Sequence, residues 1–262
     1  MQRADELTEV REYFRGNTAE WDVGRYTDET YLGRSRLALS WLRQLPAGAS
    51  VLDLGCGAGH QSDGAARLGL RVVSSDFALE MARTTRDRRG PGAAAVVADA
   101  RATPFRSERF DAVMLLGVLG YLPDPRACLE NLNDLLRPGG RLIIDVAIPE
   151  RHVLLHQLSR AASIPLGRAR RGGNGDAKPG FYARTFTKYL PEQFETMLSA
   201  AGFRTVACGG AGFGDIRLAG RAVLPWRVEK AITRGLNALS RRPAGAALAR
   251  RALIYVVQAV KQ

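Results

Sequence analysis

A glycine-rich bend directly after a short apolar run is the feature that most constrains this fold. Residues 51–54 read as a buried strand, and Gly55, Gly57 and Gly59 follow before a helix-like segment. Small residues let the backbone turn sharply and approach a ligand, and the start of the following helix offers free amide groups to an anion. A glycine trio alone is a weak signal, so its meaning depends on the pattern around it.

Strand-like and helix-like runs alternate around this bend. The further strand-like runs are residues 70–75, 94–98, 110–116 and 141–147, and the helix-like runs between them include 78–88 and 125–136. Such alternation predicts an α/β fold with a parallel sheet covered by helices on both faces. We read Pro138-Gly139-Gly140 as a turn between the last helix and strand of this block. A helix at 190–201 and strands at 203–208 and 253–260 follow.

The pattern divides the chain into four parts. Residues 1–45 read as a helical cap, in which Leu37, Trp41 and Leu45 recur at helical spacing. Residues 46–149 form the alternating core. Residues 150–188 form an insert with a short helix at 151–162 and a Gly- and Arg-rich stretch, typical of a lid over a substrate or of disorder. Residues 189–262 complete the core and include a basic helical insert at about 214–250.

Positive charge is concentrated in the two inserts. The formal net charge is +12; residues 150–188 carry eight Lys/Arg against two Asp/Glu, and residues 214–262 carry ten against two. Patches of this kind attract phosphates, anionic lipid or nucleic acid. In the second insert Val228, Ile232, Leu236 and Leu239 share a helical face. This face predicts either packing on the sheet or peripheral contact with an anionic membrane.

Three sequence features indicate a cytoplasmic location. Residues 1–10 lack the basic start and apolar core of a secretory signal. The longest nearly uncharged apolar run, residues 112–122, is well short of the about 20 residues that cross a bilayer. The chain has three cysteines, too few for a disulfide framework.

The spacing of the glycines distinguishes between two kinds of nucleotide site. A dinucleotide site has Gly-x-Gly-x-x-Gly, whose third glycine allows close helix packing beside a pyrophosphate. Here the spacing is Gly55-x-Gly57-x-Gly59, which fits a smaller anion such as an amino-acid carboxylate. The next strand ends at Asp76, where a carboxylate is placed to accept hydrogen bonds from both ribose hydroxyls.

The ordered motifs resemble those of the class I S-adenosylmethionine-dependent methyltransferases. Residues 53–59 and 74–81 are similar to that family's first two motifs, and Ala98-Asp99-Ala100 to its third. Residues 110–124 and 135–142 resemble the fourth and fifth strands with their loops. The resemblance implies a doubly wound, Rossmann-like, mostly parallel sheet of seven strands. This chain adds an N-terminal helical cap and inserts after strands 5 and 6, and the insert at about 214–250 is larger and more basic than the minimal fold requires.

The resemblance implies S-adenosyl-L-methionine as methyl donor and S-adenosyl-L-homocysteine as product. It places Asp76 on the ribose, Phe77 and Met81 beside the adenine, and Asp99 on the adenine amino group. The residues implied to bind the donor are Asp53, Gly55, Cys56, Gly57, Gly59, Asp76, Phe77, Met81, Asp99, Ala100, Leu116 and Gly117.

Methyl transfer from a sulfonium is an in-line displacement with an activated leaving group, so positioning supplies much of the rate. A base is needed only when the acceptor is protonated, as a phenol or alcohol is. Tyr121, His152 and His156 are the candidates, the two histidines sharing a face if 151–162 is helical. An equally weighted alternative makes the histidines lid or surface residues. Two histidines without a matched cluster fall short of a metal site.

We expect a small apolar or aromatic acceptor, such as a natural product, quinone precursor or lipid-like molecule, with O-methylation favoured. N- or C-methylation of a small molecule stays open. An RNA methyltransferase using the basic inserts is a second hypothesis. Against it, no Asn-Pro-Pro-Tyr or Asp-Pro-Pro-Tyr follows the fourth strand, and the arginines are not interleaved with aromatic stacking platforms. A non-catalytic donor-binding protein is a third.

Overall fold

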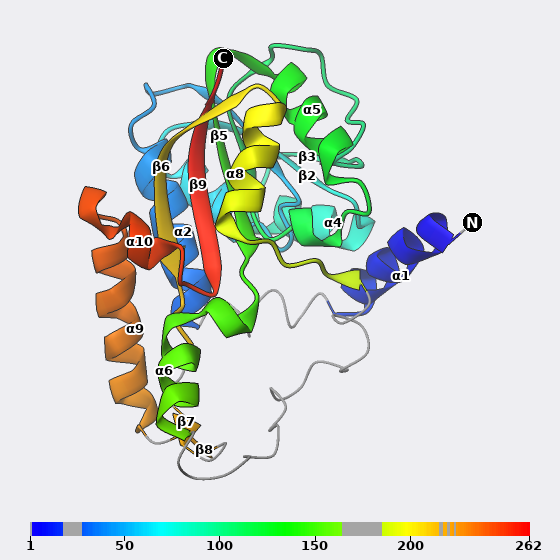
Figure 1. The fold of residues 1–262 in the computed structure, drawn as a ribbon. Coiled ribbons are helices and arrows are strands. Elements are labelled where there is room, and N and C mark those ends of the chain that lie inside the picture. Colours follow the sequence, from blue (N-terminus) through cyan, green and yellow to red (C-terminus); the bar gives the residue numbers. More distant parts are fainter. Residues whose placement is uncertain (1, 18–27, 164–184, 215–216, 219–220, 223) are drawn as a thin grey trace.

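The computed structural model describes residues 2–17, 28–163, 185–214, 217–218, 221–222 and 224–262. Within these residues seven strands form one sheet in the order β3-β2-β1-β4-β5-β9-β6 (Figure 1). The strands are β1 (Ser50–Leu54), β2 (Arg71–Asp76), β3 (Ala94–Val97), β4 (Phe110–Leu115), β5 (Leu136–Ala147), β6 (Phe203–Ala211) and β9 (Ile254–Lys261). Only β9 runs antiparallel to its neighbours β5 and β6. The expected mostly parallel, doubly wound sheet is therefore confirmed.

The strand order places a ligand site at one end of the sheet. The chain builds outward from β1 to β3 and then crosses back to β4, so the order reverses between β1 and β4. Open α/β sheets bind ligands outside the carboxyl ends of their strands at such a switch point. Because β9 is antiparallel and ends at the C-terminus, at the top of Figure 1, these carboxyl ends lie toward the bottom of that view.

Helices cover both faces of the sheet, since each buries an apolar stripe. The helices are α1 (Gln2–Gly16), α2 (Glu29–Leu42), α3 (His60–Ala66), α4 (Leu79–Arg89), α5 (Pro125–Leu135), α6 (Leu154–Ser163), α8 (Pro191–Ala200), α9 (Trp226–Ser240) and α10 (Ala246–Ala249). Short 3-10 turns are η3 (Leu119–Tyr121), η4 (Glu150–His152) and η6 (Pro243–Gly245). On one face α2 buries Leu37 and Trp41 against Val51 and Met114. The opposite face packs on α5 and α8.

The basic insert between β6 and β9 is a small substructure. It holds a hairpin of β7 (Arg217–Leu218) and β8 (Arg221–Ala222), followed by α9, which packs on α2, β6 and α10. Ile232 and Leu236 join a cluster with Phe213, whereas Val228 and Leu239 stay 43% and 47% exposed. The single apolar face expected from the sequence is thus divided between the interior and solvent. No helix in the described part of the chain combines the length and hydropathy that crossing a bilayer requires.

Two local predictions were wrong. Pro138-Gly139-Gly140 does not separate a helix from a strand, because β5 begins at Leu136 and the three residues lie within it. Phe110 pairs with Leu136 and Ala112 with Arg141, so residues 137–140 bulge opposite Asp111. The helix expected at 151–162 is split, with η4 ending at His152 and α6 starting at Leu154. The predicted glycine- and arginine-rich stretch at 167–180 lies outside the described residues.

Candidate active site

A cavity of about 820 Å³ opens at the carboxyl ends of β1, β2, β4 and β5. The glycine bend after β1 lines it, together with residues of the N-terminal helices α1 and α2. Every residue that the resemblance assigns to the donor lines this cavity except Gly59. Segments that are tens of residues apart in the sequence therefore line the same cavity.

The glycine bend has a backbone that other residues could not adopt without strain. Gly55 and Gly57 have φ angles of 77° and 54°, in the left-handed region that disfavours a side chain. A Cβ on Gly55 would lie 2.1 Å from a methyl of Val118, whereas one on Gly57 would meet nothing within 4 Å. Gly55 is thus required for packing, and Gly57 leaves open space facing the cavity.

Helix α4 holds the bend from behind. The Thr85 hydroxyl donates to the Gly57 carbonyl at 2.8 Å, and Arg88 Nε donates to the Ala58 carbonyl at 2.7 Å. A Cβ on Gly59 would lie 2.8 Å from Thr85 Oγ1, which explains the third glycine without a ligand. Gly59 therefore allows the close approach of α4, and in the structure it does not line the cavity.

Two carboxylates flank the bend: Asp53 is buried and Asp76 is half-buried. Asp76 accepts hydrogen bonds from the amides of Gly57 and Ala78, each at 2.9 Å. Burial raises the pKa of Asp76, while these amides oppose the shift. Asp53 accepts from the Ser62 hydroxyl at 2.5 Å, and burial raises its pKa to about 6. Asp76 thus fixes the bend and lines the cavity, and Asp53 ties the end of β1 to α3 through Ser62.

Part of the cavity lining is suited to a planar, partly apolar group. Phe77, Met81, Ala100 and Leu116 all line the cavity. Arg11 of α1 lies 4.0 Å from the centre of the Phe77 ring, within the range of a cation–π contact. Asp99 lines the cavity as well. Burial acts to raise its pKa, but the hydrogen bonds and charge of Arg101 outweigh burial and hold the pKa below its usual range.

A buried ion pair between α2 and β5 contributes to the cavity, and sequence reasoning missed it. Arg34 Nη1 lies 3.2 Å from Asp145 Oδ2, and the two side chains are 6% and 2% exposed. Asp145 Oδ1 accepts from the Gly117 amide at 2.6 Å. Burial raises the pKa of Asp145, and the positive charge of Arg34 counters it. The sequence offered two signals: Arg34 shares the helical face of the apolar Leu37 and Trp41, and Asp145 lies near the end of the strand predicted at 141–147.

Aromatic side chains form the remaining wall. The Tyr121 ring lies edge-on to Phe14 of α1 at 5.2 Å and to Phe186 at 4.6 Å between centroids. All three line the cavity. Tyr121 belongs to η3, Phe14 to α1 and Phe186 to the segment that begins at residue 185. This aromatic wall therefore joins three separate parts of the chain.

The two candidate histidines lie outside the cavity lining. His152 Nε2 accepts from Arg151 Nε at 3.0 Å, and the His156 ring packs over Gly214, where a Cβ would lie 2.7 Å away. Among the described residues, no three His, Cys, Asp or Glu side chains are grouped as metal ligands would be. The structure thus brings Tyr121 to the cavity and leaves both histidines outside its lining, with His156 beside the start of the basic insert.

This chain is similar to known proteins. The family model described as "Methyltransferase domain" matches residues 52–144. A ubiquinone biosynthesis O-methyltransferase of Xanthomonas axonopodis pv. citri is 38% identical over 42% of this chain and 47% of its own length. The match thus spans about half of that relative. A demethylmenaquinone methyltransferase of Streptomyces griseus is 30% identical over 76% of this chain and 88% of its own length.

The fold has solved counterparts. A 1,6-didemethyltoxoflavin-N1-methyltransferase of Burkholderia thailandensis superposes with a TM-score of 0.60 at 20% identity, covering 99% of this chain and 90% of that one. At this identity the likeness concerns the fold alone.

Proposed function

Because this chain belongs to the class I S-adenosylmethionine-dependent methyltransferases, we propose that it transfers a methyl group from S-adenosyl-L-methionine to a small aromatic or apolar acceptor. The observation that carries the proposal is one shared cavity, in which the glycine bend, Asp76 and Arg34 face the same space as the aromatic wall. Its volume of about 820 Å³ is at the upper end of ordinary ligand pockets, which suits two ligands side by side.

The chain offers a matching group for each part of the donor. Asp76 retains acceptor capacity for ribose hydroxyls, since a carboxylate has about four lone-pair sites and two amides occupy it here. The space above Gly57 admits the methionine portion, and the Arg34 guanidinium supplies the positive charge that a carboxylate needs. When bound, the donor supplies an activated methyl group. The protein's part is to orient the acceptor and exclude water.

The aromatic wall and the relatives support a quinol-like acceptor. Tyr121, Phe14 and Phe186 line the cavity together, and aromatic side chains of this kind pack favourably against a planar ring. Relatives carry names for ubiquinone biosynthesis and for demethylmenaquinone methylation. We favour a phenolic oxygen as methyl acceptor. Tyr121 is our candidate for the group that accepts the proton of the phenol, because it lines the cavity. A role of His152 or His156 as this proton acceptor stays a prediction.

Two measurements test the proposal. Calorimetry with S-adenosyl-L-homocysteine is expected to give a Kd of about micromolar order. Labelled donor incubated with catechols and hydroquinones should then yield methylated products, and an equal mass of structured RNA should yield none. Absence of binding at millimolar ligand would overturn the donor site. Binding with transfer to RNA alone would replace the small-molecule acceptor.

The outer face of α9 supports peripheral contact with an anionic membrane, where quinol-like acceptors partition. Trp226 is 66% exposed, and Arg227 and Lys230 lie 5.5 and 5.8 Å from its ring centre. In Figure 1 the start of α9 lies toward the same end of the molecule as the carboxyl ends of the parallel strands. An exposed tryptophan flanked by cations is typical of an interfacial helix.

Vesicle flotation tests this contact. The protein should float with phosphatidylcholine vesicles that contain phosphatidylglycerol and much less with phosphatidylcholine alone, because cations favour an anionic surface. Trp226→Ala should reduce flotation. The control is Leu79→Ala, which removes an exposed apolar side chain from a different helix, α4, and should leave flotation unchanged. Equal recovery of wild type and Trp226→Ala would rule out this face.

A further inference from the structure

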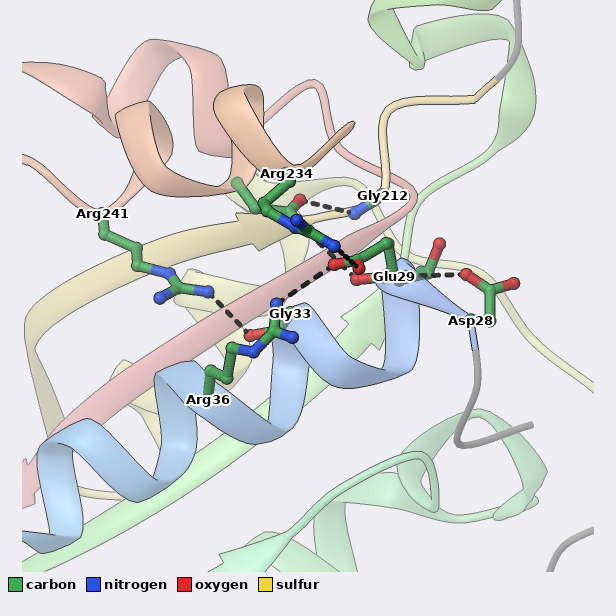
Figure 2. A network of polar contacts seen from close by, with 9 residues as sticks. Asp28, Glu29, Gly33, Arg36, Gly212, Arg234 and Arg241 are labelled. Carbon is green, nitrogen blue, oxygen red and sulfur yellow. Dashed lines mark hydrogen bonds and ion pairs between the residues drawn. The ribbon is translucent and has the colours of Figure 1, made fainter. Parts of the chain in front are cut away.

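The inner face of the basic helix α9 packs on α2, whose first turns line the cavity. Figure 2 shows Arg234 of α9 and Arg241, the residue that caps its C-terminal end, pointing at α2, where they meet Glu29 and Gly33. Arg234 Nη2 lies 2.6 Å from Glu29 Oε1, and Arg241 Nη2 donates to the Gly33 carbonyl at 3.2 Å. The positive charge of this insert suggested an external anionic partner, but two of its arginines make contacts within the protein.

Glu29 is the centre of this contact. Its side chain is 4% exposed, although it carries a carboxylate at the first position of α2. A second arginine, Arg36, reaches its other oxygen at 3.1 Å. The hydrogen bond from Arg234 lowers the pKa of Glu29, against the effect of burial. A buried carboxylate requires such partners, because an unpaired charge in the interior is strongly unfavourable.

Asn237 adds a neutral clamp one turn farther along α9. Its amide nitrogen donates to the Glu29 carbonyl at 3.1 Å, and its oxygen accepts from the Gly212 amide at 3.0 Å. A Cβ on Gly33 would lie 2.4 Å from the Asn237 amide nitrogen, so α2 and α9 are in close contact here. The position of α9 therefore sets the position of the first turns of α2.

Those first turns carry the cavity wall. Thr30, Tyr31 and Arg34 line the cavity on the side of α2 that also bears the ion pair to Asp145. Glu29 itself is absent from the lining, so it acts on a ligand only through its neighbours. The contact joins residues 205 positions apart in the sequence, across the insert and the wall.

We propose that α9 is a positioning element for the donor site: the ion pair between Glu29 and Arg234, with the Asn237 clamp, holds the start of α2 so that Arg34 faces the donor. Glu29 and Arg234 are thus positioning residues rather than donor ligands. This inference rests on the proposed function, since it assigns the insert a role in binding the donor of that reaction.

Titration of S-adenosyl-L-homocysteine into a set of full-length variants tests the inference. Glu29→Gln should weaken binding about tenfold, and Arg234→Gln about fivefold, effects on the scale of coupling between linked sites. The double variant should bind no more weakly than Glu29→Gln alone, because both substitutions remove one interaction. The matched controls are Arg126→Gln and Glu130→Gln, which break an exposed ion pair on α5 and should stay within about twofold of wild type.

The possible results separate the positioning role from the donor site itself. If wild type binds and Arg234→Gln binds within about twofold of it, the positioning role is overturned and the donor site stands. A lower melting temperature with unchanged affinity also overturns the positioning role, because the ion pair then serves stability alone. Arg234 is 62% exposed, so its variant should fold even if Glu29→Gln does not. Failure of wild type to bind overturns the proposed function and this inference with it.

Discussion

Replacing Arg34 with methionine is expected to lower the free energy of unfolding by about 3–5 kcal/mol near pH 8, the range for breaking a buried ion pair at one partner. Asp145 would keep its hydrogen bond from the Gly117 amide but lose the only cation that the structure shows within 4 Å of it among the described residues. Donor binding should weaken as well, because Arg34 lines the cavity. Urea unfolding and calorimetry with S-adenosyl-L-homocysteine measure the two effects.

The pH dependence gives this prediction its sign. Burial already raises the pKa of Asp145, and loss of Arg34 should raise it further. The folded variant then binds a proton that the unfolded chain has released, so its unfolding free energy falls as pH rises above the ordinary pKa of an aspartate. The deficit relative to wild type should thus be smaller at pH 5 than at pH 8. Arg34→Met with Asp145→Asn should regain part of the loss, and a deficit independent of pH would contradict the ion-pair explanation.

The fold could be predicted because buried parallel strands are continuous apolar runs. Residues 110–116 anticipated β4, which is almost wholly buried, to within a residue. Residues 94–98 anticipated β3 equally closely, although β3 is a half-exposed edge strand, because turn residues and a polar residue bound it. The wrong turn at 138–140 has the same origin: Pro and Gly mark a backbone irregularity, but a bulge inside β5 satisfies them as well as a loop does. The hairpin of β7 and β8 was not predicted, because its strands are two residues long. Strands this short cannot show the alternation of polar and apolar residues that marks a strand in a sequence.

The grouping of the residues that we propose for the donor could be predicted, because these residues follow the strands directly. Asp76 and Asp99 come at or just after strand ends, so their meeting at one edge of the sheet follows from topology. The other half could not. Arg34 and Asp145 are 111 positions apart, and no local pattern encodes which helix crosses which strand end. Of the helical cap expected at residues 1–45, residue 1 and residues 18–27 lie outside the described residues.

Replacing Asp76 with alanine should weaken donor binding about 100-fold. In the structure this carboxylate fixes the Gly57 and Ala78 amides, and we assign its remaining lone pairs to the ribose hydroxyls. Hydrogen bonds to a charged group are worth about 1.5–3 kcal/mol each, and about 2.7 kcal/mol is a factor of 100. Calorimetry with S-adenosyl-L-homocysteine checks the loss.

Two further variants separate the ribose contact from a general effect on the bend. Asp76→Asn keeps one acceptor oxygen and replaces the other by a donor, so it should weaken binding less than alanine does, by about tenfold. Asp87→Ala removes a carboxylate of α4 that is 73% exposed and should leave affinity unchanged. A bend that collapses without Asp76 would lower the melting temperature of both Asp76 variants alike. Because asparagine nearly matches aspartate in shape, a normal melting temperature with weakened binding isolates the ligand contact. Unchanged affinity in Asp76→Ala would show that the sugar is held elsewhere in the cavity.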